Sequence, residues 1–198
     1  MKLVLQRVEG AAVRVAATGE EVSRIGKGIV CLLGISKKDH KVDLDYGVKK
    51  CLGTRLWEDP SGKPWQKNVT DVGYEILVVS NFTLQAQTKK GFQPDFSRAM
   101  SPDEARSMYE SFVASLRAAY QPDKIKTGRF QTCTRVEIHN DGPVTITIDT
   151  QDLQLNRSSS SPPGSSGNSV QSSATATAGE NCKEAIQNND LGTHPKHS

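Results

Sequence analysis

Apolar residues along the first three quarters of the chain fall into short runs that predict a β-sheet. Two of these runs, 28–35 and 75–80, are apolar almost throughout, which is typical of central strands that are buried on both faces. In the run 12–16, Val13 and Val15 alternate with Arg14, which is typical of a strand with one solvated face. The predicted strands are 2–8, 12–16, 21–25, 28–35, 75–80, 135–139 and 144–149.

Two further segments carry apolar residues at helical spacing. Over 41–52 the spacing predicts an amphipathic helix, and Gly53 is placed to end it. The second helix opens at Ser101, with Pro102 as its first helical residue and Glu104 placed to complete a capping box. Its apolar stripe consists of Ala105, Met108, Tyr109, Phe112, Val113, Leu116 and Tyr120. A sheet with two amphipathic helices defines a single α+β domain.

The composition changes near residue 152. Residues 153–198 contain no aromatic residue and are rich in Ser, Pro, Gly and Asn. Such a segment buries too little apolar surface to offset the entropy lost on ordering. We therefore expect a folded domain over 1–152 and a disordered tail over 153–198.

Composition and charge narrow the class of protein. The chain has 198 residues and a net charge of +3, which permits a polyanionic partner without demanding one. Its four cysteines form no CxxC pair, so we expect reduced thiols, no metal site and no cofactor. The apolar stretch in residues 1–8 is too short for a signal peptide or a membrane span, and we expect a cytoplasmic protein with no membrane partner.

Candidate chemistry is sparse. The predicted domain holds only two histidines, His40 and His139, and no GxSxG, HExxH or P-loop motif, which disfavours triad and metal mechanisms. Two features remain: the polar stretch Ser80-Asn81-Phe82-Thr83 after a core strand, and the pair Gly142-Pro143 after Asn-Asp. From the residues alone, the structural interpretation is favoured for both: the first is a strand end that satisfies backbone groups, and the second is a tight connection between strands.

Six segments, in this order, resemble the D-aminoacyl-tRNA deacylase family and together cover almost all of residues 1–150. They are Val4-Leu5-Gln6-Arg7-Val8, Leu32-Leu33-Gly34-Ile35, Val79-Ser80-Asn81-Phe82-Thr83-Leu84, Pro94-Asp95-Phe96, Thr127-Gly128-Arg129-Phe130 and Asn140-Asp141-Gly142-Pro143-Val144-Thr145. The resemblance implies a barrel-like antiparallel or mixed sheet and a homodimer. It also implies a proofreading hydrolase that removes D-amino acids, and misplaced glycine, from the 3′ end of tRNA.

The same resemblance implies roles for individual residues. A cis Gly142-Pro143 of one subunit would reach into the other subunit's site and reject L-amino acids by backbone shape. Ser80, Asn81, Phe82 and Thr83 would form the catalytic segment, whose backbone N–H groups hold the developing negative charge. The 2′-hydroxyl of the terminal adenosine would assist hydrolysis, since a threonine nucleophile needs an adjacent base and Thr83 has none evident.

The resemblance further implies a pocket wall and a tRNA contact. Gln131, Thr132, Cys133 and Thr134 would line the pocket. Lys89 and Lys90 would contact the phosphates of the acceptor stem.

The chain departs from the family pattern at two places. Asn81 stands where the family has Gln, and 130–134 reads Phe-Gln-Thr-Cys-Thr where the family has Phe-Gly-Ala-x-Met. Three interpretations stay open: an active D-aminoacyl-tRNA deacylase with a modified pocket, a related proofreading deacylase with altered selectivity, and a non-catalytic nucleic-acid-binding module. We favour the first.

Overall fold

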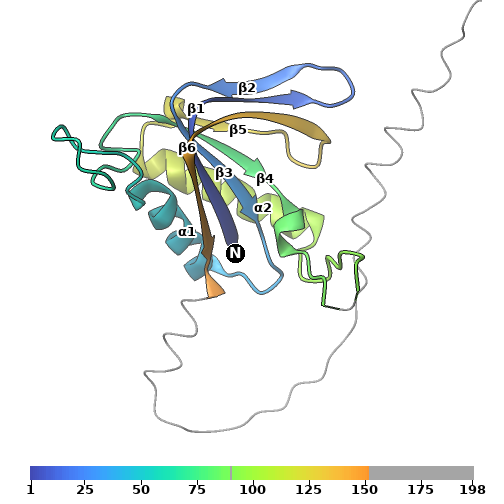
Figure 1. The fold of residues 1–198 in the computed structure, drawn as a ribbon. Coiled ribbons are helices and arrows are strands. Elements are labelled where there is room, and N and C mark those ends of the chain that lie inside the picture. Colours follow the sequence, from blue (N-terminus) through green and yellow to red (C-terminus); the bar gives the residue numbers. More distant parts are fainter. Residues whose placement is uncertain (90, 152–198) are drawn as a thin grey trace, which may run out of the picture.

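A computed structural model describes residues 1–89 and 91–151. The elements, in chain order, are β1 (Lys2–Val15), β2 (Glu21–Ile25), β3 (Gly28–Gly34), α1 (Lys41–Gly53), β4 (Glu75–Ser80), the 3₁₀ turn η1 (Phe82–Gln85), α2 (Pro102–Ala119), the 3₁₀ turn η2 (Pro122–Lys124), β5 (Ile125–Thr127) and β6 (Thr134–Asp149). Strands and helices therefore occur in one α+β unit, as predicted (Figure 1).

The long strand β1 organises the sheet. The strand order is β2-β1-β3-β4-β5, and β6 pairs with the remaining edge of β1. Pairs of β1 with its neighbours are antiparallel, whereas β3–β4 and β4–β5 are parallel, so the sheet is mixed. The Ser23 hydroxyl of β2 donates to the Thr127 carbonyl of β5 at 2.7 Å, which brings the two ends of the path together. The result is a nearly closed barrel.

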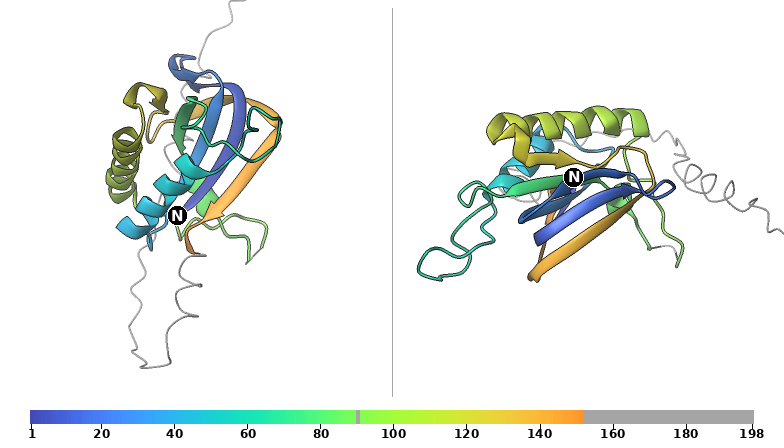
Figure 2. Two further views of the ribbon diagram at one scale, coloured as in Figure 1. Left: turned by 90° about the vertical axis from the view of Figure 1, so that its left-hand side faces the viewer. Right: turned by 90° about the horizontal axis from the view of Figure 1, so that it is seen from above.

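Both helices cover the same face of this sheet (Figure 2). The main core lies between them and the strands, with Leu3, Leu33 and Phe112 fully buried. At Gly47 of α1 an added Cβ would lie 3.1 Å from the Phe112 ring, so the small residue lets the helices approach. In the described residues, no helix is both long and apolar enough to cross a membrane.

Four of the predicted strands were wrong in their boundaries, because they merge in pairs into two long strands. The predicted strands 2–8 and 12–16 form one strand, β1, and 135–139 and 144–149 form one strand, β6. The turn-forming residues between them do not end the strands, because β1 and β6 pair along their whole length and take up the extra residues as bulges.

The other element predictions agree closely with the structure. The predicted strands 21–25 and 75–80 and both helices are present, and Pro102 is the first residue of α2. The predicted capping box is wrong in one detail: the Ser101 hydroxyl donates to the Glu104 carboxylate at 2.6 Å and makes no cap bond to the backbone. Ser101 is thus satisfied by the side chain that was expected to complete the box.

A buried polar cluster joins the two ends of the described domain. The Met1 ammonium donates to the Asp39 carboxylate and, at 2.7 Å, to the Thr150 hydroxyl, which donates to Asp43 at 2.6 Å. Burial raises the pKa of Asp39. Burial alone would also raise the pKa of Asp43, but hydrogen bonds from Thr150 and from the His40 backbone outweigh it and lower that pKa.

The cysteine prediction holds in part. Cys31 and Cys51 are free and buried, as expected, and Cys182 lies outside the described residues. The predicted tail, 153–198, lies outside the described residues.

Candidate active site

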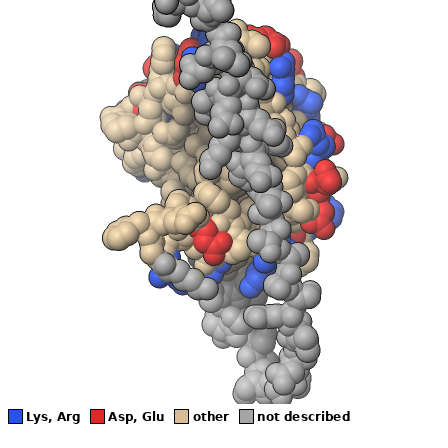
Figure 3. All heavy atoms as spheres, turned by 90° about the vertical axis from the view of Figure 1, so that its right-hand side faces the viewer, with Lys and Arg blue, Asp and Glu red and all other residues tan. Residues whose placement is uncertain are grey.

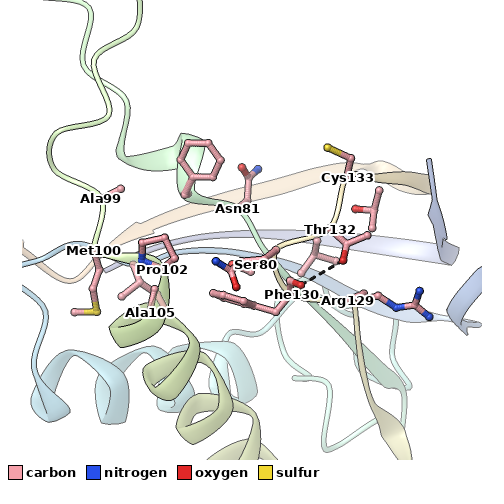
Figure 4. A pocket seen from close by; sticks show the side chains of 15 residues that line it. Ser80, Asn81, Ala99, Met100, Pro102, Ala105, Arg129, Phe130, Thr132 and Cys133 are labelled. Carbon is pink, nitrogen blue, oxygen red and sulfur yellow. Dashed lines mark hydrogen bonds between the residues drawn. The ribbon is translucent and has the colours of Figure 1, made fainter. Parts of the chain in front are cut away.

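A pocket of about 270 Å³ opens at the carboxyl end of β4 (Figure 4). Three segments form most of it: the end of β4 with η1, the first turn of α2 with the residues before it, and the loop that leads into β6. The lining residues are Ile35, Val79, Ser80, Asn81, Phe82, Ala99, Met100, Pro102, Ala105, Arg129, Phe130, Gln131, Thr132, Cys133 and Thr134. The structure thus brings together the two stretches, 80–82 and 131–134, that the sequence singled out.

The turn after β4 is held close to the end of β3. A Cβ added at Gly34 would lie 2.7 Å from the Leu84 Cβ, so only glycine allows η1 to pack there. The buried Gln85 amide donates to the Gly34 carbonyl at 2.7 Å. Because of these contacts, the strand ends at Ser80, and Asn81 and Phe82 turn along the pocket.

The turn also leaves backbone donors available. The first N–H groups of a helical turn have no partner within it. Here the bonds of the turn begin with the Leu84 N–H, which donates to the Asn81 carbonyl at 3.3 Å. The N–H groups of Phe82 and Thr83 precede that first bond, at the pocket's edge.

Thr83 differs from its three neighbours. It does not line the pocket, and its hydroxyl donates to the Asn81 side-chain oxygen at 2.5 Å. Asn81 therefore orients the threonine, as expected of a strand end that satisfies local groups.

The pocket offers no proton-transfer pair. Among the described residues that line it there is no Asp, Glu or His. Arg129 points its guanidinium away from the other labelled side chains (Figure 4) and bonds Glu20 at 2.6 Å, which raises the pKa of Arg129 and lowers that of Glu20. The described lining side chains therefore do not favour acid–base catalysis.

The loop before β6 has an unusual backbone. Gln131 has a φ of 53°, in the left-handed region that glycine favours. Its side-chain oxygen accepts a hydrogen bond from Arg106 of α2, whose guanidinium also lies 4.8 Å from the centre of the Phe130 ring. Nothing in the sequence pattern pointed to Arg106, because its partners are distant in sequence.

Gly142 and Pro143 lie on a bulge of β6. Asn140 pairs with Val8 and Thr145 with Gln6, so the four residues 141–144 face the single residue Arg7. The Gly142-Pro143 peptide bond is cis, and both residues are exposed.

Side chains fix this bulge. The Asn140 amide donates to the carbonyls of Arg7, at 2.8 Å, and Val144, at 3.2 Å. Arg7 bonds the Leu56 carbonyl at 2.6 Å, and its Nε lies 2.8 Å from the Asp141 carboxylate as an ion pair, not as an aligned hydrogen bond. The bulge is therefore held from both sides.

Within one chain the bulge and the pocket lie far apart. Arg7, opposite the bulge, pairs with Ile29 near the start of β3, whereas Ser80 pairs with Leu33 near its end. Along β6, Gly142 is eight residues beyond the pocket residue Thr134, roughly 26 Å of strand at ~3.3 Å per residue. The structure does not bring Gly142 and Pro143 to the pocket of their own chain.

The predicted tRNA contacts are only partly placed. Lys89 is exposed, and Lys90 lies outside the described residues. Along one visible edge in Figure 3, Lys and Arg side chains are interleaved with Asp and Glu. Charge along this edge does not mark a nucleic-acid surface.

Several lining residues were missed from the sequence. Ala99, Met100, Pro102 and Ala105 form the wall opposite the loop before β6. The start of α2 was predicted correctly, but nothing local indicated that it faces β4. In the described residues no group of three or more His, Cys, Asp and Glu side chains is placed to hold a metal ion.

The fold and the pocket define a small α+β domain with a ligand-sized site that lacks a nucleophile–base pair. Residues 4–149 match the model of the D-Tyr-tRNA(Tyr) deacylase family, and the chain belongs to this family. It is 45% identical to the D-aminoacyl-tRNA deacylase of Plasmodium falciparum, over 79% of this chain and 100% of that protein. It is 50% identical to the human D-aminoacyl-tRNA deacylase 1, over 75% of this chain and 70% of that protein.

Two solved structures extend the comparison. One, described as a c-Myc DNA unwinding element binding protein, is 50% identical with a TM-score of 0.72, and the match covers 75% of this chain and 98% of that one. The other, described as a probable eukaryotic D-amino acid tRNA deacylase, is 17% identical with a TM-score of 0.61. That match covers 74% of this chain and 97% of the other one. The second shows a shared fold only.

Proposed function

We propose that this protein hydrolyses the ester bond of D-aminoacyl-tRNA, and of mischarged glycyl-tRNA, to release the free amino acid and tRNA. The observation that carries the proposal is the pocket itself. In this chain, which belongs to the family, Ser80, Asn81 and Phe82 lie beside residues 131–134 in one cavity. The relatives named D-aminoacyl-tRNA deacylase supply the substrate class.

The absence of Asp, Glu and His among the described lining residues favours a mechanism that uses the substrate's own groups. Water attacks the ester carbonyl carbon, the bond to the ribose oxygen breaks, and the 2′-hydroxyl of the terminal adenosine assists the proton transfer. The N–H groups of Phe82 and Thr83 hold the negative charge that develops on the carbonyl oxygen. Loss of one such donor typically costs about 10²- to 10³-fold in rate.

Selection against L-amino acids would come from the Gly142-Pro143 backbone of a second subunit. Its carbonyl oxygens would stand where an L side chain has to go, whereas a D side chain points elsewhere and glycine has none. Because the bulge lies far from the pocket of its own chain, this function requires a homodimer. The exposed position of both residues on a bulge suits insertion into a partner.

The nucleic-acid partner would be the 3′ end of aminoacyl-tRNA in the cytoplasm. Lys89, exposed near η1, is one candidate for a backbone phosphate contact, and Lys90 is proposed from the sequence alone.

A deacylation assay tests the proposal. The purified protein should release D-tyrosine from D-Tyr-tRNA and spare L-Tyr-tRNA, and finding no D-specific release at micromolar enzyme would overturn it. A variant with one residue inserted between Asp141 and Gly142 should lose activity while it remains a dimer by light scattering. Unchanged turnover in that variant would show that the bulge is not the filter.

A non-catalytic nucleic-acid-binding module is a second candidate, because one structure at 50% identity is described as a DNA-element binding protein. That function predicts duplex DNA binding that survives substitutions in the pocket. A related deacylase with altered selectivity predicts release of an L-amino acid such as L-alanine. The same assay, run with both classes of acyl-tRNA and a DNA-binding control, separates the three.

A further inference from the structure

The pocket wall contains a residue whose backbone does not suit its side chain. Gln131 adopts a φ of 53°, a region that most L residues avoid because the Cβ crowds the backbone. Asparagine and aspartate are tolerated there more often, and glycine most of all. Left to itself, a glutamine would favour another conformation, so contacts elsewhere must hold Gln131 in place.

Those contacts come from one face of α2. The Arg106 guanidinium donates to the Gln131 side-chain oxygen and lies over the Phe130 ring, 4.8 Å from its centre. One turn further along the helix, the Tyr109 ring packs on Phe130 with centroids 5.5 Å apart. The Tyr109 hydroxyl donates to the Val78 carbonyl of β4 at 2.9 Å, which ties this face to the central sheet.

Phe130 and Gln131 both line the pocket, and Arg106 does not. Any effect of Arg106 on the shape of the pocket is therefore transmitted through its contacts with these two residues. Tyr109 is buried and fixes the Phe130 ring from the core side, whereas Arg106 is exposed and covers it from the solvent side. Without Arg106, the Phe130 ring keeps its packing on Tyr109 and the core, whereas Gln131 loses the one side-chain hydrogen bond that it makes among the described residues.

We infer that Arg106 is a positioning residue, which locks Phe130 and Gln131 in the geometry that shapes the acyl-binding pocket. This inference rests on the proposed deacylation, because its first readout is turnover. It also predicts that the lock is needed only because residue 131 is not glycine. In a Gln131→Gly variant the left-handed backbone is favourable by itself, and Arg106 should matter little.

An exposed arginine near a tRNA site could instead contact a phosphate. The two roles differ in their salt dependence, because each phosphate contact contributes about one unit to the slope of log affinity against log salt. Removal of a phosphate contact reduces this slope by about one and is not rescued by a change at residue 131. Removal of a positioning contact leaves the slope unchanged.

The test is a double-mutant cycle on kcat/KM for D-Tyr-tRNA, measured between 50 and 200 mM salt. Arg106→Ala should reduce kcat/KM by about fivefold to thirtyfold, the combined scale of one hydrogen bond and one exposed cation–π contact. In the Gln131→Gly background the same substitution should cost about twofold or less. Glu110→Ala, an exposed substitution one turn along the same helix, is the control for general effects on α2.

Amide hydrogen exchange provides a readout that does not need turnover. Arg106→Ala should speed exchange in residues 129–134 and leave β4 protected. Loss of activity in both backgrounds with a reduced salt slope would assign Arg106 to a phosphate and overturn the inference. Unchanged activity and unchanged exchange would overturn it too, whereas a wild-type protein without D-specific release would count against the proposed function itself.

Discussion

The side-chain amide of Asn140 donates to the carbonyl oxygen of Arg7 at 2.8 Å, and the same amide donates to Val144 at 3.2 Å. One side chain thus closes the bulge that carries Gly142 and Pro143. Because both bonds are donated, Asn140→Asp should be no better than Asn140→Ala. Each should lower the free energy of unfolding by about 1–3 kcal/mol, on the scale of two hydrogen bonds.

Urea denaturation measures this loss, and D-Tyr-tRNA turnover measures its effect on the bulge. The exposed His139→Ala, one residue away, serves as control. If Asn140→Asp kept wild-type stability, the donor role of the amide would be wrong.

Gly142 should be intolerant of any side chain. An added Cβ would lie 2.8 Å from the Val144 Cγ2 and 3.0 Å from the Val144 nitrogen, and φ is +113°. Gly142→Ala should therefore shift the bulge and reduce kcat/KM for D-Tyr-tRNA by at least about tenfold, the change expected when ~1.4 kcal/mol of transition-state binding is lost.

Gly19→Ala is the matched control for Gly142→Ala. Gly19 also has a positive φ, of +73°, but nothing lies within 4 Å of its added Cβ. It should lose some stability and retain turnover. Equal losses of turnover in the two variants would point to a general folding defect.

Thr83 should be dispensable for the chemical step. Its hydroxyl bonds the Asn81 side chain and does not line the pocket. Thr83→Val keeps the shape and the backbone N–H, so turnover should stay within about a few-fold of wild type, on the scale of one lost neutral hydrogen bond. A drop in turnover of three orders of magnitude in Thr83→Val, with Thr83→Ser still active, would instead show that the hydroxyl is the nucleophile.

The buried Asp43 should make the free energy of unfolding depend on pH in the acid range. Its pKa is lowered in the folded state, so its contribution is complete above about pH 4, the ordinary range of aspartate, and is lost as the pH falls below that. Asp43→Asn should lower the free energy of unfolding at pH 7 by about 1–3 kcal/mol. It should also flatten the acid limb of the stability curve.

Asp45→Asn is the control for this prediction. Asp45 lies on the same helix but is only partly buried and pairs with Lys41 at the surface. Its acid limb should match wild type, and so should the value at pH 7 to within about 0.5 kcal/mol. An unchanged acid limb in Asp43→Asn would show that Asp43 does not carry the acid dependence. Asp39 cannot account for such a limb, because its raised pKa favours the folded state as the pH falls.

The elements were predictable because their signals are local. Residues 75–80 are a strand by composition alone, and Ser101 and Pro102 mark the start of α2 within one residue. The joining of 135–139 to 144–149 was not predictable, since it depends on pairing with β1 across more than a hundred residues of chain.

The site follows the same division. The family resemblance named Ser80, Asn81, Phe82 and residues 131–134, all of which line the pocket. It did not name the α2 wall or Arg106, because side chains from separate elements meet there only after folding. The departure at Gln131 was visible in the sequence, but its left-handed backbone was not.

The strand β6 connects the loop that lines the pocket to the bulge that carries Gly142 and Pro143 without a break. On the proposed function, each site of a dimer takes its pocket from one copy and its filter from the other. A subunit impaired in the bulge and a subunit impaired in the pocket would therefore complement each other. Mixed dimers of the two variants would contain one site assembled entirely from undamaged parts and should regain activity that neither homodimer has.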